Sequence, residues 1–174
     1  MKTIEMPADL ACDAFCLSRI LVPVDFSSLS KKALEYAKQL AMHLGADLTL
    51  LHVLEPEIPP TFDGYMISAP LVTAPMSGAS EKRELKTLVN SAHSAGIRQV
   101  HSTIRQGLPS HEIVDAAKDL NVDLIVLGTH GYTGWKHFCI GSTAERVVRA
   151  AHCPVLVVRD KEHEFTATQC YAEA

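Results

Sequence analysis

The residues most able to do chemistry in this chain lie between Gly128 and Thr143. Three glycines, Gly128, Gly131 and Gly141, are spaced along this segment, and the hydroxyl residue Ser142 follows the last of them. Glycine lets a backbone adopt positive φ and approach a ligand without a Cβ atom in the way. Where a helix begins, free amides and the helix dipole favour an anion, and serine adds a hydroxyl donor. The segment therefore predicts a phosphate-binding loop.

The spacing of the glycines by itself leaves two interpretations open. The glycines either bind phosphate or only shape a surface loop, and the spacing favours neither. Two better-known nucleotide signatures are missing. The chain has no G-x-x-x-x-G-K-[ST] stretch, which excludes a P-loop, and the first predicted strand leads into residues 24–27 (VDFS) rather than into G-x-G-x-x-G. A dinucleotide-binding site of the Rossmann type is therefore disfavoured.

The glycine segment lies between a predicted strand and a predicted helix, and the whole chain alternates in this way. Continuous aliphatic runs predict buried strands at residues 19–24, 46–54, 97–105, 123–127 and 154–158. Apolar residues that recur every three or four positions predict helices around residues 33–44, 80–95, 113–120 and 142–151. Ser27 or Ser28 is expected to cap the start of the first helix and Gly45 to cap its end.

Apolar strands separated by amphipathic helices predict an α/β domain in which helices cover both faces of a five-stranded parallel sheet. Residues 55–78 are rich in Pro, Ser and Thr and have no sustained period, so a long loop is expected there. The chain is predicted to consist of an N-terminal extension (residues 1–17), one domain (18–160) and a polar C-terminal tail (161–174).

Composition argues against several classes of partner. The 174 residues carry a formal net charge of −4 and no stripe of Lys or Arg, which argues against nucleic-acid binding. The apolar runs are too short to span a membrane, and Glu5, Asp9 and Asp13 interrupt the N-terminal segment, so neither membrane association nor a secretory signal is expected. Five cysteines without the spacing of a disulfide framework or a zinc site predict reduced thiols and a cytoplasmic protein.

The glycine segment and its surroundings resemble the universal stress protein family. The pattern Gly-x2-Gly-x9-Gly-[Ser/Thr] is the signature of the ATP-binding branch of that family, and Gly128, Gly131, Gly141 and Ser142 match it. The neighbouring segments are similar as well. Residues 19–27 (RILVPVDFS) resemble the first strand and turn of the family, 50–53 (LLHV) its second strand, 123–131 (DLIVLGTHG) its fourth strand, and 142–159 its closing helix and strand. The resemblance covers about residues 18–159.

The resemblance implies a Rossmann-like fold of the adenine-nucleotide alpha hydrolase-like type, with five parallel strands in the order 3-2-1-4-5. In that order Asp25 and Gly128 lie at the carboxyl ends of neighbouring strands, where open α/β sheets bind ligands. The resemblance further implies that Asp25 lies near the ribose and phosphates of ATP or AMP, and that the backbone of Val53 contacts adenine. The nucleotide-binding residues implied in this way are Pro23, Val24, Asp25, Val53, Gly128, Thr129, His130, Gly131, Gly141, Ser142 and Thr143.

Some of these residues keep a second interpretation. Asp25 lies two residues before Ser27, so it could turn or cap the chain instead, and as a ligand it is also a candidate contact for Mg²⁺. His130 could donate to a phosphate or pack outward. His52, next to Val53, is expected to be a hydrogen-bonded core residue rather than a ligand.

The resemblance predicts a regulatory or sensory protein of the stress response that binds ATP or AMP. One alternative is a slow Mg²⁺-dependent ATPase, although the chain lacks a Walker lysine and an evident catalytic base. The other is a nucleotide-free dimeric interaction module, against which the intact glycines argue. The resemblance also implies that the last strand, Val155–Val158, lies at the sheet edge and pairs with a second copy, so a two-fold homodimer is expected.

Overall fold

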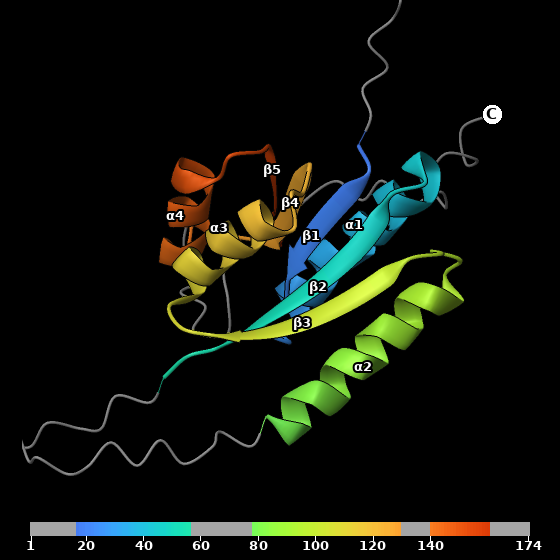
Figure 1. Ribbon diagram of the computed structural model, residues 1–174, viewed down its shortest axis with the longest axis horizontal. Helices are drawn as coiled ribbons and strands as arrows, with labels where there is room; N and C mark the ends of the chain where they lie inside the picture. The colour runs from blue at the N-terminus through green and yellow to red at the C-terminus, as the bar shows by residue number, and fades with distance from the viewer. Residues whose placement is uncertain (1–16, 57–77, 130–139, 161–174) are drawn as a thin grey trace, which may run out of the picture.

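Five parallel strands form one sheet, and four helices flank it in the residues that the structure describes (Figure 1). The computed structural model of the protein describes residues 17–56, 78–129 and 140–160. The elements are β1 (Arg19–Pro23), α1 (Ser28–Leu44), β2 (Asp47–Leu54), α2 (Ala79–Ser94), β3 (Val100–Gln106), α3 (Pro109–Asp119), β4 (Leu124–Gly128), α4 (Ser142–Ala150) and β5 (Val155–Val158).

The strands lie in the order β3-β2-β1-β4-β5, which confirms the predicted topology. β1 occupies the middle of the sheet, as Figure 1 shows, and Ile20 pairs with Leu48 of β2 on one side and with Leu124 of β4 on the other. The chain runs outward from β1 to β3 and then returns to the other side of β1 for β4 and β5. The strand order therefore changes direction between β1 and β4, and open α/β sheets bind ligands at such a point.

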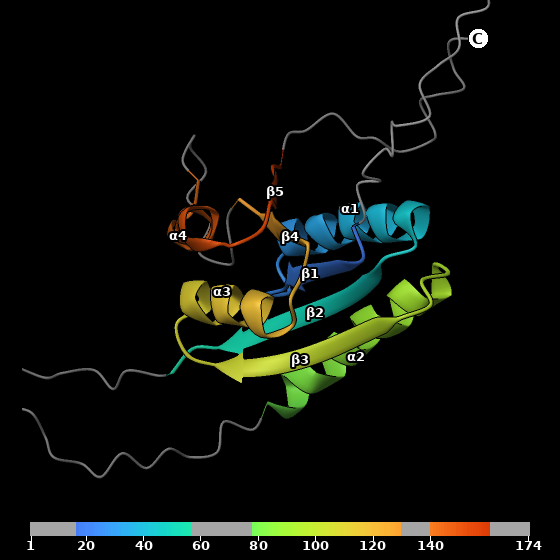
Figure 2. The same cartoon turned by 45° about the horizontal axis from the view of Figure 1, so that its top comes forward.

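Side chains of the central strands alternate between two cores. Ile20 and Val22 of β1 lie in the core under α1 and α2, whereas Leu21 lies in the core under α3 and α4, and all three are fully buried. Burying a side chain of this size stabilises the fold by about 1.5–3 kcal/mol relative to exposure. Figure 2 shows α2 beneath β3 near one edge of the sheet and α4 beside β5 near the other. The prediction of helices on both faces is confirmed.

Helix α1 carries both of the caps that its sequence predicts. Ser27 is the residue before the helix, and its Oγ accepts a hydrogen bond from Ser30 N at 3.1 Å. Gly45 ends the helix with φ of +67°, a left-handed conformation that glycine adopts without strain. The 17 residues of α1 bury one stripe, which contains Ala33, Leu34 and Ala37. Among the described residues, none of the helices is both long enough and apolar enough to cross a membrane.

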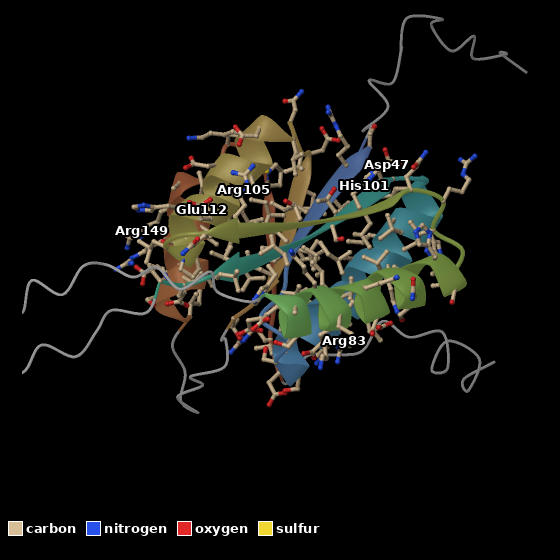
Figure 3. The ribbon with its side chains drawn as sticks, turned by 60° about the horizontal axis from the view of Figure 1, so that its bottom comes forward. Asp47, Arg83, His101, Arg105, Glu112 and Arg149 are labelled. Atoms are coloured by element: carbon tan, nitrogen blue, oxygen red, sulfur yellow. The ribbon has the colours of Figure 1, made fainter. Side chains whose placement is uncertain are left out.

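An arginine joins α3 to the edge strand β3. Arg105 of β3 donates from Nη2 to Asp119 Oδ2 at 2.8 Å, and its Nη1 lies 4.0 Å from Glu112 Oε2. Figure 3 shows Arg105 and Glu112 close together on the side of the sheet that α3 covers. Because these groups are partly exposed to water, each pair stabilises the fold by about 1 kcal/mol or less.

The predicted start of the third strand is wrong. The sequence predicts residues 97–105, but β3 begins at Val100. Ile97 is buried, yet it reaches the core from the turn after α2, where Gly96 has φ of +94° and Ile97 N donates to Ala92 O at 3.4 Å. An apolar residue signals burial, and a turn can bury a side chain as well as a strand can.

Candidate functional site

Three strand ends meet at one level on the carboxyl side of the sheet. The registers in which β1 pairs with β2 and with β4, continued past the end of β1, set Val24 level with His52 on one side and with Gly128 on the other. Asp25 and Val53 follow Val24 and His52 in the chain. The fold therefore brings the predicted residues of three separate segments to the point where the strand order changes direction.

The turn after β1 is held together by its own polar groups. Pro23 is half-buried and Val24 is buried, and Val24 N donates to Leu51 O at 2.8 Å, which continues the pairing with β2. Asp25 Oδ1 accepts hydrogen bonds from Ser27 N at 3.1 Å and from Ser27 Oγ at 2.6 Å. The interpretation of Asp25 as a residue that turns the chain is confirmed. Its role as a nucleotide ligand stays a prediction.

Phe26 in the same turn is a residue that the sequence analysis missed. Its φ is +64°, a left-handed conformation that costs a non-glycine residue about 1–3 kcal/mol. The Phe26 ring lies against the His52 ring, with 4.6 Å between ring centres and an angle of 36° between the planes. No local sequence pattern predicts such a residue, because the ring that packs against Phe26 belongs to His52 on another strand.

His52 is hydrogen-bonded, as predicted, although it is half-buried rather than enclosed in the core. Its Nδ1 lies 2.8 Å from Val24 O. Because a carbonyl oxygen can only accept, Nδ1 carries the hydrogen in this pair. Val53, the next residue, is also half-buried and packs against the core under α3 and α4. The two residues therefore have different surroundings although they are adjacent in the chain.

Gly128, at the end of β4, has a packing role that the sequence did not reveal. A Cβ atom at this position would lie 2.9 Å from Leu29 Cγ and 3.3 Å from the Leu29 backbone. The backbone does not adopt a positive φ here, so glycine is needed at this position for the close approach and not for its conformation. The missing side chain lets the first turn of α1 pack directly on β4.

The start of α4 lies beside the end of β4. Gly141 precedes the helix, and its N donates to Thr129 O at 2.7 Å. Thr129 is buried, and its own N donates to Val158 O at 2.9 Å. Gly141 has φ of −60° and ψ of 150°, a conformation that any residue adopts. The backbone bonds of Thr129 thus link α4, β4 and β5.

The first amides of α4 have no acceptor in the part of the chain that the structure describes. Gly141 makes no side-chain cap, and neither the backbone nor a side chain accepts from the amides of Ser142, Thr143 and Ala144. Ser142 is exposed and Thr143 is half-buried. These amides and the helix dipole favour an anion. Since the amide of Gly141 is already bonded, the available donors begin at Ser142.

Two of the predicted site residues, His130 and Gly131, lie outside the described residues. The structure therefore describes the two ends of the glycine segment, Gly128 with Thr129 and Gly141 with the start of α4. The predicted residues that it describes divide into two groups: the turn after β1 with Val53 of β2, and the region where β4 ends and α4 begins.

A carboxylate from α2 lies near His52. Ser80 Oγ donates to Glu81 Oε2 at 2.7 Å, and this hydrogen bond is the main reason why the pKa of Glu81 lies below its usual value. The charge of His52 lowers the pKa of Glu81 as well, but less. Within the described ranges, no three His, Cys, Asp or Glu side chains are grouped so that they could hold a metal ion.

The amino-acid sequence matches proteins of one family along most of its length. The model of the universal stress protein family matches residues 17–159. Universal stress protein MJ0531 of Methanocaldococcus jannaschii is 32% identical over 156 residues, with 84% of each chain covered. Universal stress protein YxiE of Bacillus subtilis is 34% identical over 146 residues, with 82% of this chain and 99% of its own covered.

Solved structures agree with the sequence comparison. Universal stress protein UspA from Lactobacillus plantarum has a TM-score of 0.71 and 30% identity, with 82% of this chain and 98% of its own covered. A universal stress protein in complex with cAMP has a TM-score of 0.63 and 22% identity (83% and 98% covered), and one from Archaeoglobus fulgidus in complex with dAMP has 0.59 and 23% (82% and 98% covered). These last two show the shared fold. From its sequence and its fold, this chain belongs to the universal stress protein family.

Proposed function

We propose that the protein binds an adenine nucleotide, ATP or AMP, at the carboxyl ends of β1 and β4 and serves as a regulatory or sensory protein in a stress response. The observation that carries this proposal is the start of α4. Three consecutive amides, from Ser142 to Ala144, have no acceptor among the described residues, and they lie beside the point where the strand order changes direction. An anionic group such as a phosphate is the ligand that such a helix end favours.

The individual roles follow the resemblance that the sequence analysis describes. The phosphates would lie at the start of α4, near Gly141, Ser142 and Thr143, with His130 and Gly131 completing the segment. The ribose would lie between the Asp25 turn and Gly128 with Thr129. Adenine would contact the backbone of Val53, and Pro23 and Val24 would form the adjoining wall. The strand registers support this arrangement. Continued past the end of β1, they set Val24 level with His52 of β2 and with Gly128 of β4, so the three segments are neighbours.

The structural relatives support a nucleotide only in general terms. Universal stress proteins have been solved with cAMP and with dAMP, but those two chains are 22% and 23% identical to this one. The choice of ATP or AMP therefore rests on the signature Gly128, Gly131, Gly141 and Ser142 in this chain. Asp25 remains the candidate contact for Mg²⁺, and its Oδ1 already accepts from Ser27.

Calorimetry on protein stripped of endogenous nucleotide tests whether the protein binds an adenine nucleotide. We expect heat of binding with ATP or AMP and none with inorganic phosphate alone at equal concentration. Chromatography of the nucleotide extracted from freshly purified protein then identifies which of the two is carried. A Gly131→Val variant serves as the matched control, because it adds bulk inside the signature. No heat with either nucleotide on well-folded protein would refute the proposal.

Phosphate release tests the alternative of a slow ATPase. Incubation with ATP and Mg²⁺ should release phosphate no faster in the wild-type protein than in the Gly131→Val control, because the chain lacks a Walker lysine. Rapid release that the control loses would identify an enzyme instead of a binding protein.

We further propose a two-fold homodimer through β5, and a location in the cytoplasm as the thiols of the sequence suggest. β5 lies at the end of the strand order, and nearby large apolar side chains are partly exposed: Leu156 to 37%, Val148 to 46% and Ile140 to 50%. Pairing of an edge strand with a second copy would cover such groups. Light scattering at micromolar concentration should give a dimer for the wild type and a monomer for Leu156→Glu. A monomeric wild type would exclude the homodimer.

A further inference from the structure

One imidazole contacts the turn after β1 on both sides of Asp25. His52 Nδ1 donates to Val24 O at 2.8 Å, and the His52 ring lies 4.6 Å from the ring of Phe26. Val24 and Phe26 are the residues immediately before and after Asp25. A third interaction lies within the turn itself, where Ser27 N and Ser27 Oγ both donate to Asp25 Oδ1. The backbone around Asp25 is thus fixed from β2 as well as from the start of α1.

The conformation that this imidazole supports is a strained one. Phe26 has φ of +64°, which L-residues other than Asn and Asp rarely adopt. Such conformations persist only where the surrounding structure over-determines them, and they gather at functional sites. In this turn the tilted ring contact with His52 opposes relaxation of Phe26, and the hydrogen bond from His52 fixes Val24, the residue at which the turn begins.

Packing alone does not account for a histidine at this position. His52 and Phe26 are both half-buried, so an aliphatic side chain would fill the same space at the edge of the core. An aliphatic side chain would leave Val24 O without the His52 donor. The polar contact therefore acts on the shape of the turn, and the turn carries Asp25.

We propose that His52 is a positioning residue for the nucleotide site, which fixes the Asp25 turn in the conformation that receives the ribose hydroxyls. The proposal rests on the proposed function, since it needs a bound nucleotide to be positioned. His52 touches the turn and not the ligand, so its effect on affinity passes through Asp25.

Binding of three ligands by two variants of His52 distinguishes a positioning role of this residue from a general effect on the stability of the fold. His52→Leu keeps an apolar side chain but removes the donor to Val24 O. His52→Asn keeps a donor, because the asparagine Nδ2 occupies nearly the place of the histidine Nδ1. Calorimetry with ATP, AMP and 2′,3′-dideoxy-ATP on nucleotide-stripped protein measures affinity. The last ligand lacks the hydroxyls that the Asp25 carboxylate would accept from.

We expect His52→Leu to weaken binding of ATP and AMP by about tenfold and binding of dideoxy-ATP by about twofold or less. The reason is that a displaced Asp25 carboxylate would no longer accept from a ribose hydroxyl, and about tenfold corresponds to one hydrogen bond to a charged group. His52→Asn should recover affinity to within about threefold of the wild type. If His52 acted on folding alone, the affinity for all three ligands would fall by the same factor.

The outcomes distinguish this proposal from the proposed function. Wild-type protein that binds neither ATP nor AMP overturns both. Wild-type binding together with an unchanged affinity of His52→Leu for ATP overturns only the role of His52, as does equal weakening for ATP and dideoxy-ATP. Should His52→Leu fail to fold, Phe26→Leu removes the ring contact instead. Phe26→Leu should lower the affinity for ATP by about threefold and leave the affinity for dideoxy-ATP unchanged. An equal effect on both affinities would overturn the proposal.

Discussion

The carboxyl ends of β1 and β4 are neighbours in the sheet, but the helices that follow the two strands begin in different ways. The turn after β1 caps its helix: Ser27 Oγ accepts from Ser30 N, and Asp25 Oδ1 holds the serine in place. The segment after β4 ends in Gly141, which has no side chain with which to cap α4. The side chain of Ser27 thus caps α1, whereas no side chain among the described residues caps α4.

A missing cap is not in itself a sign of binding. Helices α2 and α3 also lack a side-chain cap, at Gly78 and Leu108. What distinguishes α4 is its place, because Gly141 is bonded to Thr129 directly after β4. In the described part of the chain, three helices thus share the lack of a side-chain cap, and it is the location of α4 beside the end of β4 that supports the proposed phosphate site there.

The largest effect on stability should come from a change at the contact between the end of β4 and the start of α1. Gly128→Val would place atoms at 2.9 Å from Leu29 Cγ and against the Leu29 backbone, so it should push α1 away from β4. Overpacking of this kind should lower the free energy of unfolding by about 1–3 kcal/mol. Urea denaturation measures this. Wild-type stability in the variant would show that α1 and β4 are not in close contact.

A capping residue at Gly141 would make the start of α4 like that of α1. Gly141→Asp fits the observed φ of −60° and ψ of 150°, and its carboxylate should accept from the first amides of α4. We expect the free energy of unfolding to rise by a few tenths of a kcal/mol, roughly, while the affinity for ATP falls about tenfold or more because the carboxylate occupies the place of a phosphate. Calorimetry and urea denaturation measure the two effects.

Gly141→Asn is the matched control, because it caps the helix without a charge. It should lower the affinity for ATP less than Gly141→Asp does. If both variants bind ATP as tightly as the wild type, the start of α4 does not hold the phosphates, and the contrast between the two turns has no functional meaning.

The smallest effect should come from removing the cap that α1 already has. Ser27→Ala removes the hydroxyl that accepts from Ser30 N and donates to Asp25, and it should lower the free energy of unfolding by about 1 kcal/mol. The affinity for ATP should fall less than in Gly141→Asp. Ser28→Ala, an exposed neighbour, is the control for urea denaturation. A stability loss in the control as large as in Ser27→Ala would contradict the role of the cap.

Local patterns predicted those features of the fold that local chemistry determines. Apolar periodicity located the helices and strands, and the residue types Ser27 and Gly45 marked the two ends of α1. The strand order came from resemblance to a family, because pairing between distant segments leaves no period in the sequence. Ile97 shows the limit of the pattern, since its apolar side chain is buried by a turn and not by a strand.

The sequence and its resemblance placed Asp25, Val53 and Gly128 at the carboxyl ends of neighbouring strands, but not the contacts that these segments make there. Gly128 was predicted from its place in the signature, but the sequence did not show that its missing Cβ makes room for Leu29, a residue about a hundred positions away in the chain. The left-handed Phe26 and the bond from His52 to Val24 were likewise not foreseen. Each of these contacts joins segments that only the folded chain brings together, so no window of sequence contains both partners.

The contact between Gly128 and Leu29 has a consequence for motion. Backbone and side-chain atoms of Leu29 already lie against Gly128, which leaves no slack between α1 and β4. Packed elements of this kind cannot slide toward each other, so the two should move as one rigid block when a ligand arrives. The start of α4 is joined to this block differently, through hydrogen bonds of the peptide groups of Thr129, which also connect it to β5.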